Sequence, residues 1–296
     1  MTLYTAVIIA TKDRPQEVSN LLDALALQTV LPDVIVVSAC DPSDIEQSSV
    51  GAKNVQVLFG PPGSSAQRNQ ALSLVQGKCD IVVFFDDDFI PSRFWIERIQ
   101  MLLAAQSDTV CVTGQILVDG VKIGGLEWSD GQSIVSKADS SKKIVTMNDH
   151  NTQDLKSPYG CNMAFRAKSI EHLRFDERLI LYGWLEDRDF GFRAGARARI
   201  ISTDVVWGVH LGTKRGRVSG LRFGYSQVVN PWYLMKKGSM TPFDVYRSIF
   251  HGLAANALGT FFRNSHVDRW GRLKGNIIAI KDIIFNRWAP ERIAEL

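Results

Sequence analysis

The N-terminal third of the chain alternates between continuous apolar runs and apolar residues at helical spacing. Four runs that predict strands occupy residues 6–10, 34–37, 55–58 and 81–85. All except 55–58, which contains Gln56, are continuously apolar, as is typical of strands buried on both faces. After the first run, Val18, Leu21 and Leu25 recur at the spacing of one buried helical face. Because strands that alternate with helices form parallel sheets with right-handed crossovers, this pattern predicts an α/β fold.

Proline and glycine mark the predicted helix boundaries around the fourth run. A turn at 60–63 precedes a helix that Gly77 ends. Pro91 predicts the start of the next helix, whose inner face carries Ile96 and Ile99.

The second half of the chain is less regular. Apolar runs there predict strands over 109–118, 160–165 and 198–207. A helix is expected to begin at the acidic residues 186–189 and to end at Gly195. Residues 119–156 are polar without a clear period, which predicts a loop or a weak hairpin.

Length and composition indicate a globular protein of one large domain or two small ones. The chain has 296 residues, of which 45% are hydrophobic. Its four cysteines lack the spacing of a zinc or redox site, which predicts reduced thiols in a cytoplasmic protein. No basic segment precedes the first apolar run, so this run predicts a strand and not a signal peptide. No stretch of the sequence is apolar over enough residues to predict a membrane-spanning helix.

Charge is divided unevenly along the chain. Residues 214–296 carry fourteen basic and five acidic residues, a net charge of +9, whereas residues 1–213 have a net charge of −6. We therefore expect a functional division near residue 215. The basic excess carries no nucleic-acid-binding motif, so we expect no nucleic acid as a partner.

Two apolar stripes run through this basic C-terminal region at near-helical spacing. They comprise Val245, Ile249, Leu253 and Leu258, and then Leu273, Ile277, Ile280 and Ile284. Basic amphipathic helices of this kind lie in the interface of anionic membranes, which predicts a peripheral protein at the inner face of the cytoplasmic membrane. The alternative is that both stripes pack on the rest of the protein.

Three consecutive carboxylates end the fourth apolar run. Asp86, Asp87 and Asp88 repel one another, and a folded protein rarely tolerates such a cluster without a cation. In open α/β sheets, ligands bind at the carboxyl ends of strands, which is where this cluster falls. The alternative is a solvated acidic turn that caps the next helix.

Three motifs in this order resemble glycosyltransferase family 2. They are Asp86–Asp88 ahead of Pro91, Glu186-Asp187 within the 184–191 stretch WLEDRDFG, and the 60–72 segment. The resemblance covers about residues 4–215. It implies the GT-A fold, a Rossmann-like, mostly parallel central sheet with flanking helices. Residues 269–284 also resemble tails of bacterial members that build surface polysaccharides.

The resemblance implies a domain organisation and a reaction. Residues 1–215 would form the catalytic domain, with a nucleotide-sugar half at about 1–118 and an acceptor half at about 119–215, and residues 216–296 a basic helical extension. The expected reaction moves a sugar from a nucleoside-diphosphate sugar to a hydroxyl of a saccharide or lipid-linked saccharide. Mg²⁺ or Mn²⁺ would stabilise the leaving diphosphate.

The resemblance also suggests roles for individual residues. The metal would be held by Asp88, Asp86 and His210, although Asp86 is also a candidate partner of the ribose and a lone histidine after a strand is often structural. Asp187 would be the general base, which implies direct displacement and inversion. The alternative is that Asp187 caps a helix, and capping is also the alternative for Glu186 and Asp189.

The remaining candidates fall into two groups. Those expected to bind the nucleotide sugar are Thr11, Arg14, Asp41, Arg68, Asp86, Asp87, Lys214, Arg215 and Arg217. Those expected to shape the acceptor pocket are Tyr159, Asn162, Trp184 and Glu186. The alternatives are an exposed helix position for Arg68 and ordinary core packing for the aromatic residues.

Functions from other classes fit less well. A sugar-nucleotide pyrophosphorylase needs a glycine-rich loop after the first strand, but residues 11–15 contain no glycine. Phosphatases with an aspartate nucleophile place their acidic motif after the first strand, not the fourth. A non-catalytic nucleotide- or carbohydrate-binding module stays open, since such a module would not need Asp187.

Overall fold

The computed structural model describes residues 3–46, 50–141, 151–215, 218–260 and 267–296. These residues divide into two compact units. The first comprises residues 1–62, 67–174 and 190–216, and the second comprises residues 63–66, 175–189 and 217–296. The predicted assignment of donor and acceptor halves stays a prediction.

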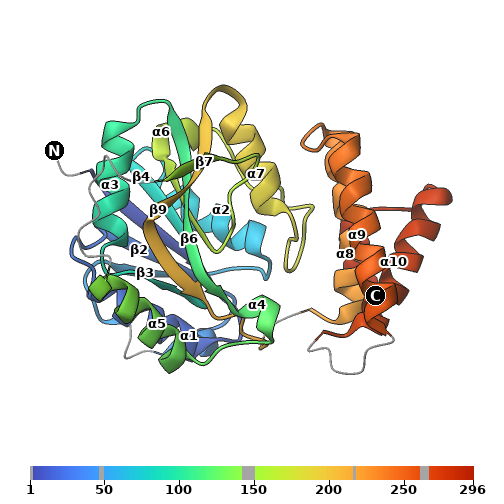
Figure 1. Cartoon of the computed structure of the whole chain (residues 1–296), viewed down its shortest axis with the longest axis horizontal. Helices are drawn as coiled ribbons and strands as arrows, with labels where there is room; N and C mark the ends of the chain where they lie inside the picture. Colours follow the sequence, from blue (N-terminus) through green and yellow to red (C-terminus); the bar gives the residue numbers. More distant parts are fainter. Residues whose placement is uncertain (1–2, 47–49, 142–150, 216–217, 261–266) are drawn as a thin grey trace. The chain divides into compact units, whose positions relative to one another are not determined.

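A nine-stranded sheet forms the centre of the first unit, among the residues that the structure describes (Figure 1). Its strand order is β3-β2-β1-β4-β8-β6-β9-β5, with β7 paired to β9. The strands are β1 (Thr5–Ala10), β2 (Val34–Ala39), β3 (Val55–Phe59), β4 (Ile81–Asp86), β5 (Phe89–Pro91), β6 (Thr109–Asp119), β7 (Thr152–Asp154), β8 (Asn162–Arg166) and β9 (Arg199–His210). Strands β1 to β4 are parallel, whereas β8 is antiparallel to both of its neighbours.

Helices flank this sheet, which confirms the predicted α/β class. They are α1 (Pro15–Ala26), α2 (Ser64–Val75), α3 (Trp95–Ala105), α4 (Gly120–Ile123), α5 (Trp128–Ser141), α6 (Ala167–Ile170) and α7 (Glu186–Ala194). The division between the two units falls within α2 and α7.

The core lies on both faces of the sheet because successive strand residues point to opposite sides. On one face, Phe85 of β4 belongs to the same buried cluster as Leu21 of α1 and Ile99 of α3. On the other face, the ring of Phe84 meets Phe165 and Phe190 edge to face, with centroids 6.0 and 6.3 Å away. The fourth apolar run is therefore buried on both faces, as its lack of alternation predicts.

The prediction of a helix starting at Pro91 was wrong. Residues 89–91 form β5, which pairs antiparallel with β9, and the helix begins only at Trp95. Strand β5 ends the strand order and is an edge strand, so the missing N–H of Pro91 disrupts no inner ladder.

The prediction of a loop or hairpin over 119–156 was also wrong in part. Helices α4 and α5 occupy its first half, β7 lies near its end, and residues 142–150 lie outside the described part. Helix α5 buries only a narrow stripe, in which Val135 packs with Val209 and Leu211. So few apolar positions in a polar segment leave no visible helical period.

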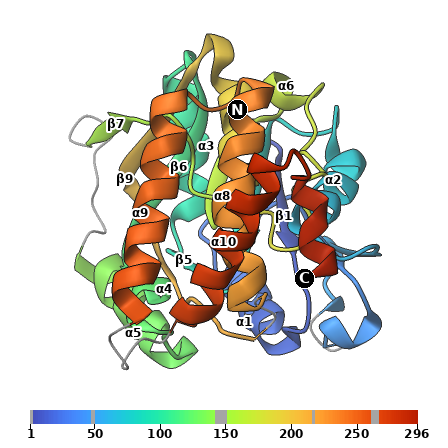
Figure 2. The same cartoon turned by 90° about the vertical axis from the view of Figure 1, so that its right-hand side faces the viewer.

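The second unit contains the C-terminal helices α8 (Gly220–Lys237), α9 (Pro242–Thr260) and α10 (Arg269–Ile284), which Figure 2 shows side by side. Helices α8 and α10 approach closely, since a Cβ added at Gly275 would lie 2.1 Å from the Leu221 carbonyl oxygen. Some residues of the two predicted apolar stripes are buried, and others are exposed to solvent. Val245 is buried, whereas Leu258 and Ile284 are exposed. In the described part of the chain, no helix is long and apolar enough to cross a membrane.

Candidate active site

The three aspartates lie at the carboxyl edge of the sheet. Asp86 is the last residue of β4 and pairs in register with Ala10 of β1, so the acidic turn lies beside the end of β1. Strand β5 begins directly after Asp88, and its first residue, Phe89, pairs with His210. His210 is thus the last residue of β9 and does not lie past its end as predicted.

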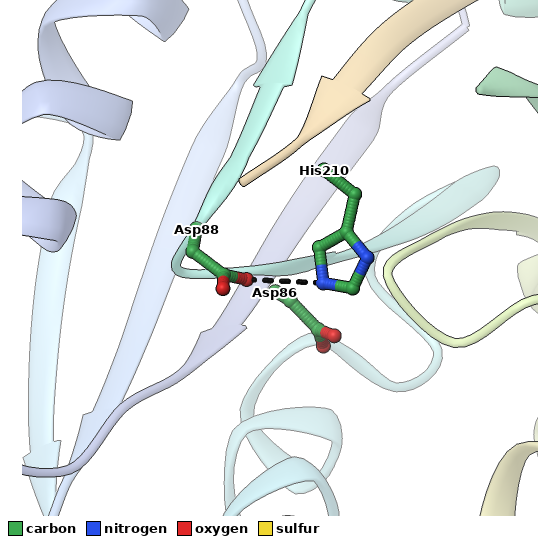
Figure 3. A group of neighbouring side chains, drawn as sticks. All are labelled: Asp86, Asp88 and His210. Carbon is green, nitrogen blue, oxygen red and sulfur yellow. Dashed lines mark ion pairs between the residues drawn. The ribbon is translucent and has the colours of Figure 1, made fainter. Parts of the chain in front are cut away.

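Asp86, Asp88 and His210 form a candidate metal centre (Figure 3). Each offers one ligand atom, and these atoms all lie within 4.8 Å of one another. Nε2 of His210 lies 3.3 Å from Oδ1 of Asp88. Two carboxylates and an imidazole are a donor set that suits Mn²⁺, so the residues present fit a divalent cation.

Electrostatics at this cluster favour a cation. Burial alone would raise the pKa of Asp88, but His210, Arg14 and the Thr213 N–H together lower it to about 2. Burial alone would lower the pKa of His210, but hydrogen bonds to Asp119 and Asp88 raise it to about 10. The carboxylates therefore stabilise the protonated, positively charged form of the His210 ring. A divalent cation bound here would compensate the same negative charge.

The middle aspartate, Asp87, is not part of this cluster, and both of its carboxylate oxygens accept hydrogen bonds. Its Oδ1 accepts from Arg14 Nη1 at 2.7 Å, and its Oδ2 accepts from the Thr11 hydroxyl at 2.8 Å. Burial raises the pKa of Asp87 to about 7, although the charge of Arg14 opposes this rise. These contacts tie the end of β1 to the acidic turn, and the predicted nucleotide-sugar contacts of Thr11, Arg14 and Asp87 stay predictions.

Arg14 also holds the segment that follows His210. Its Nε donates to the Arg215 carbonyl at 2.7 Å and its Nη2 to the Thr213 carbonyl at 3.1 Å. The Thr213 N–H in turn donates to Asp88 Oδ2 at 2.7 Å. The segment is thereby fastened to the acidic turn, with the side chains of Lys214 and Arg215 exposed to solvent. Arg217, another predicted contact, lies outside the described residues.

Arg68 is buried, so the alternative of an exposed helix arginine does not hold. Its Nη2 donates to Asp86 Oδ1 at 2.7 Å and to the Gly160 carbonyl at 3.3 Å. Arg68 therefore holds a candidate metal ligand in place.

Asp41 is the N-cap of the short 3₁₀ helix Pro42–Asp44, and its side chain accepts from the Ser43 N–H. Sequence reasoning missed the neighbouring Asp44. This buried carboxylate accepts from the N–H groups of Asp13, Cys40 and Asp41, so it joins the ends of β1 and β2. Its only signal in the sequence is its position just after a strand.

Two of the predicted acceptor residues lie near the cluster in the first unit. The hydroxyl of Tyr159 lies 3.4 Å from His210 Nδ1 and 3.3 Å from Asp119 Oδ2. Asn162 is fully buried, and its Oδ1 accepts from the Gly114 N–H at 2.6 Å. That placement gives Asn162 a structural role within the sheet.

The acidic motif 186–189 and Trp184 belong to the second unit or to its boundary. Asp187 is partly exposed in the first turn of α7, and its Oδ1 accepts from the Arg188 N–H at 2.7 Å. Asp189 is fully buried and binds Lys237 at 2.8 Å and the Ser239 hydroxyl at 2.6 Å, which makes it structural.

The chain before α7 is constrained. Leu181 and Leu185 have φ angles of 60° and 75°, in the left-handed region that leucine rarely adopts. The Trp184 ring lies near Phe223, and its carbonyl accepts from Asn230. Strain of this kind is typical of functional segments.

Comparison with known proteins supports a transferase assignment. The model of glycosyl transferase family 2 matches residues 6–174, more than half of the chain. Among curated proteins, none matches the chain significantly.

The fold resembles solved structures at low sequence identity. The mannosyltransferase PcManGT from Pyrobaculum calidifontis, in complex with GDP-Man and Mn²⁺, is 16% identical with a TM-score of 0.54; the match covers 97% of this chain and 89% of that one. Residues 1–349 of S. aureus TarS are 15% identical with a TM-score of 0.56, over 99% and 83% of the two chains. GalNAc-T7 with UDP, GalNAc and Mn²⁺ is 13% identical with a TM-score of 0.56, over 99% and 56%.

The match with a longer TarS structure covers 44% of that chain. At these identities the likeness is one of fold. The α/β sheet and the family match together define a glycosyltransferase. The chain belongs to glycosyltransferase family 2.

Proposed function

We propose that the chain is a metal-dependent, inverting glycosyltransferase. It would move a sugar from a nucleoside-diphosphate sugar to a hydroxyl of a saccharide or lipid-linked saccharide. The observation that carries this proposal is the convergence of Asp86, Asp88 and His210 within 4.8 Å at the carboxyl edge of the sheet. Mn²⁺ or Mg²⁺ held there would neutralise charge on the leaving diphosphate. The presence of Mn²⁺ in the PcManGT and GalNAc-T7 structures supports the metal requirement.

Residues of the chain itself would bind and orient the donor. Lys214 and Arg215 are exposed on the segment that Arg14 fastens to the acidic turn, so their charges are available to diphosphate oxygens. Arg217 continues the same basic run in the sequence. Asp41, at the end of β2, remains our candidate for contact with the base.

Asp187 is our candidate for the general base. A sugar hydroxyl is a poor nucleophile, and a carboxylate that accepts its proton assists the attack. The first turn of α7 favours the charged form of Asp187 through the helix dipole. Direct attack on the donor inverts the anomeric configuration. Trp184, Glu186 and Tyr159 are our candidates for the acceptor pocket, and the contacts of Asn162 favour a structural role instead.

A panel of nucleotide sugars with simple saccharide acceptors tests this function. Release of nucleoside diphosphate, measured with and without a metal chelator, should identify at least one donor and should stop in the chelator. The anomeric configuration of the product, read by NMR, should be opposite to that of the donor. Full turnover in the chelator or retention of configuration would each refute part of the proposal.

The second unit supports a peripheral membrane location and a lipid-linked acceptor in surface polysaccharide synthesis. Exposed aromatic residues Phe243, Tyr246 and Phe250 recur along α9, and the exposed Trp270 lies at the start of α10. Exposed basic residues accompany them at Arg247, Lys274 and Lys281. Apolar side chains among basic ones favour an anionic lipid surface, where each basic residue contributes about 1 kcal/mol.

Co-sedimentation with anionic and neutral liposomes tests this location. Binding should require anionic lipid, weaken at high salt, and fall when Arg247 and Lys274 are both changed to Glu. Lys237, which pairs with Asp176 and Asp189, is left intact. The matched control changes the exposed Lys53 and Lys168 to Glu. If the control loses binding equally, the attraction is not specific to α9 and α10.

A further inference from the structure

His210 is held between two carboxylates, one at each ring nitrogen. Its Nε2 faces Asp88 Oδ1 at 3.3 Å, and its Nδ1 faces Asp119 Oδ1 at 3.1 Å. Asp88 is one of the candidate metal ligands, whereas Asp119 is not among them. The two nitrogens therefore face different groups, and only Nε2 is directed toward the metal cluster.

We propose that Asp119 is a positioning residue that orients His210 for metal binding. This inference rests on the proposed function, because it needs a metal ion at Asp86, Asp88 and His210. A histidine that ligates a metal through one nitrogen usually donates its other N–H to a carboxylate, which fixes the tautomer and the ring orientation. In this structure Nε2 shares its proton with Asp88. With a cation bound, Nδ1 would keep donating to Asp119 and the Nε2 lone pair would be free to face the ion.

The sheet places Asp119 for this task. Asp119 ends β6 and pairs in register with His210, the last residue of β9, across two parallel strands. A register shift between Ile116 and Val118 lies just before it. The side chains of Asp119 and His210 are only 10% and 8% exposed, so water competes little for their contact.

Tyr159 completes the arrangement. Its hydroxyl lies 3.3 Å from Asp119 Oδ2, and its ring meets the His210 ring edge to face with centroids 5.8 Å apart. The ring of His210 is thus packed on one side and hydrogen-bonded at both nitrogens. Such support limits its rotation, which preorganises the site.

Asp119 also has a structural role as a helix cap, and the test variants must preserve this role. It is the N-cap of the four-residue helix α4, and its side chain accepts from the Val121 N–H at 3.3 Å. Serine is a good N-cap as well, but its shorter side chain does not span the distance to His210. Asp119→Ser therefore retains the cap and removes the contact with the ring, whereas Asp119→Asn retains the cap and a neutral acceptor.

The experiment measures Mn²⁺ affinity of the full chain by electron paramagnetic resonance of free Mn²⁺. We expect Asp119→Ser to weaken Mn²⁺ binding by about 10–100-fold, and Asp119→Asn to weaken it less. The control Asp154→Ser, at an exposed aspartate of β7, should bind Mn²⁺ like the wild type. Thermal unfolding of each variant reports whether the fold is intact.

Two further variants separate this inference from the proposed function. Asp88→Ala and His210→Ala should each abolish tight Mn²⁺ binding. If both do so while Asp119→Ser and Asp119→Asn bind like the wild type, the positioning role is refuted and the metal site stands. If Asp88→Ala leaves the affinity unchanged, the metal site itself is refuted, and the role of Asp119 with it.

Discussion

Replacing Arg14 with Met should destabilise the protein strongly, because Arg14 is the ion-pair partner of the buried Asp87. The side chains of Arg14 and Asp87 are 16% and 5% exposed, and they meet at 2.7 Å. Removing one partner of a buried ion pair costs about 3–5 kcal/mol, since the other charge stays buried without compensation. For a domain of this size, 1 kcal/mol corresponds to about 2–4 °C, so the melting temperature should fall by roughly 6–20 °C.

The size of this loss should depend on pH. The pKa of Asp87 is already raised to about 7, and removing the positive charge of Arg14 raises it further. The unfolded chain has a carboxyl pKa of about 3.9, so between these values the folded state binds the extra proton. Stability therefore falls as pH rises through this range, and the deficit of Arg14→Met should be larger at about pH 8.5 than at about pH 5.5.

Circular dichroism melts at both pH values measure this effect. Adding Asp87→Asn to Arg14→Met removes the stranded charge and should recover much of the loss at high pH. Arg199→Met is the matched control, because Arg199 pairs with Asp108 and Asp154 at the surface, and it should change the melting temperature little. A deficit for Arg14→Met no larger than that of the control, or one independent of pH, would refute the reasoning.

Three further predictions concern the donor, the base and the second unit. Arg215→Ala should weaken binding of nucleoside diphosphate in calorimetry while nucleoside binding changes much less; equal losses would indicate a folding defect. Asp187→Asn should lower turnover by about 10²–10⁴-fold with donor binding retained, and normal turnover would place the base elsewhere. Gly275→Val should destabilise the C-terminal helices, because even a Cβ there would lie 2.1 Å from the Leu221 carbonyl oxygen. An unchanged melting curve would contradict that packing.

Sequence patterns predict those parts of the site that lie at strand ends. The apolar run 81–85 and the carboxylates after it predict a buried strand that ends at charged residues. In the structure, this run forms the buried strand β4, which ends at Asp86. His210 follows a run that predicts a strand, although its place inside β9 depends on pairing with Phe89.

Other parts of the site depend on contacts between distant segments. Asp119 contacts His210 because of the register between β6 and β9, and no local sequence pattern predicts this register. The sequence leaves open whether Arg68 faces the nucleotide or solvent, and only its contacts with Asp86 and Gly160 show that it is buried. Helix α5 buries too few apolar residues to show a period, because most of its surface faces solvent.

The position of a bound metal ion tests the central claim most directly. Crystals of the full chain grown with Mn²⁺ and a nucleoside diphosphate would show the ion by its anomalous scattering. We expect one strong anomalous peak that is coordinated by Asp86, Asp88 and Nε2 of His210 and that contacts the diphosphate. A peak bound elsewhere, or a diphosphate bound at this edge without any ion, would contradict the proposed active site.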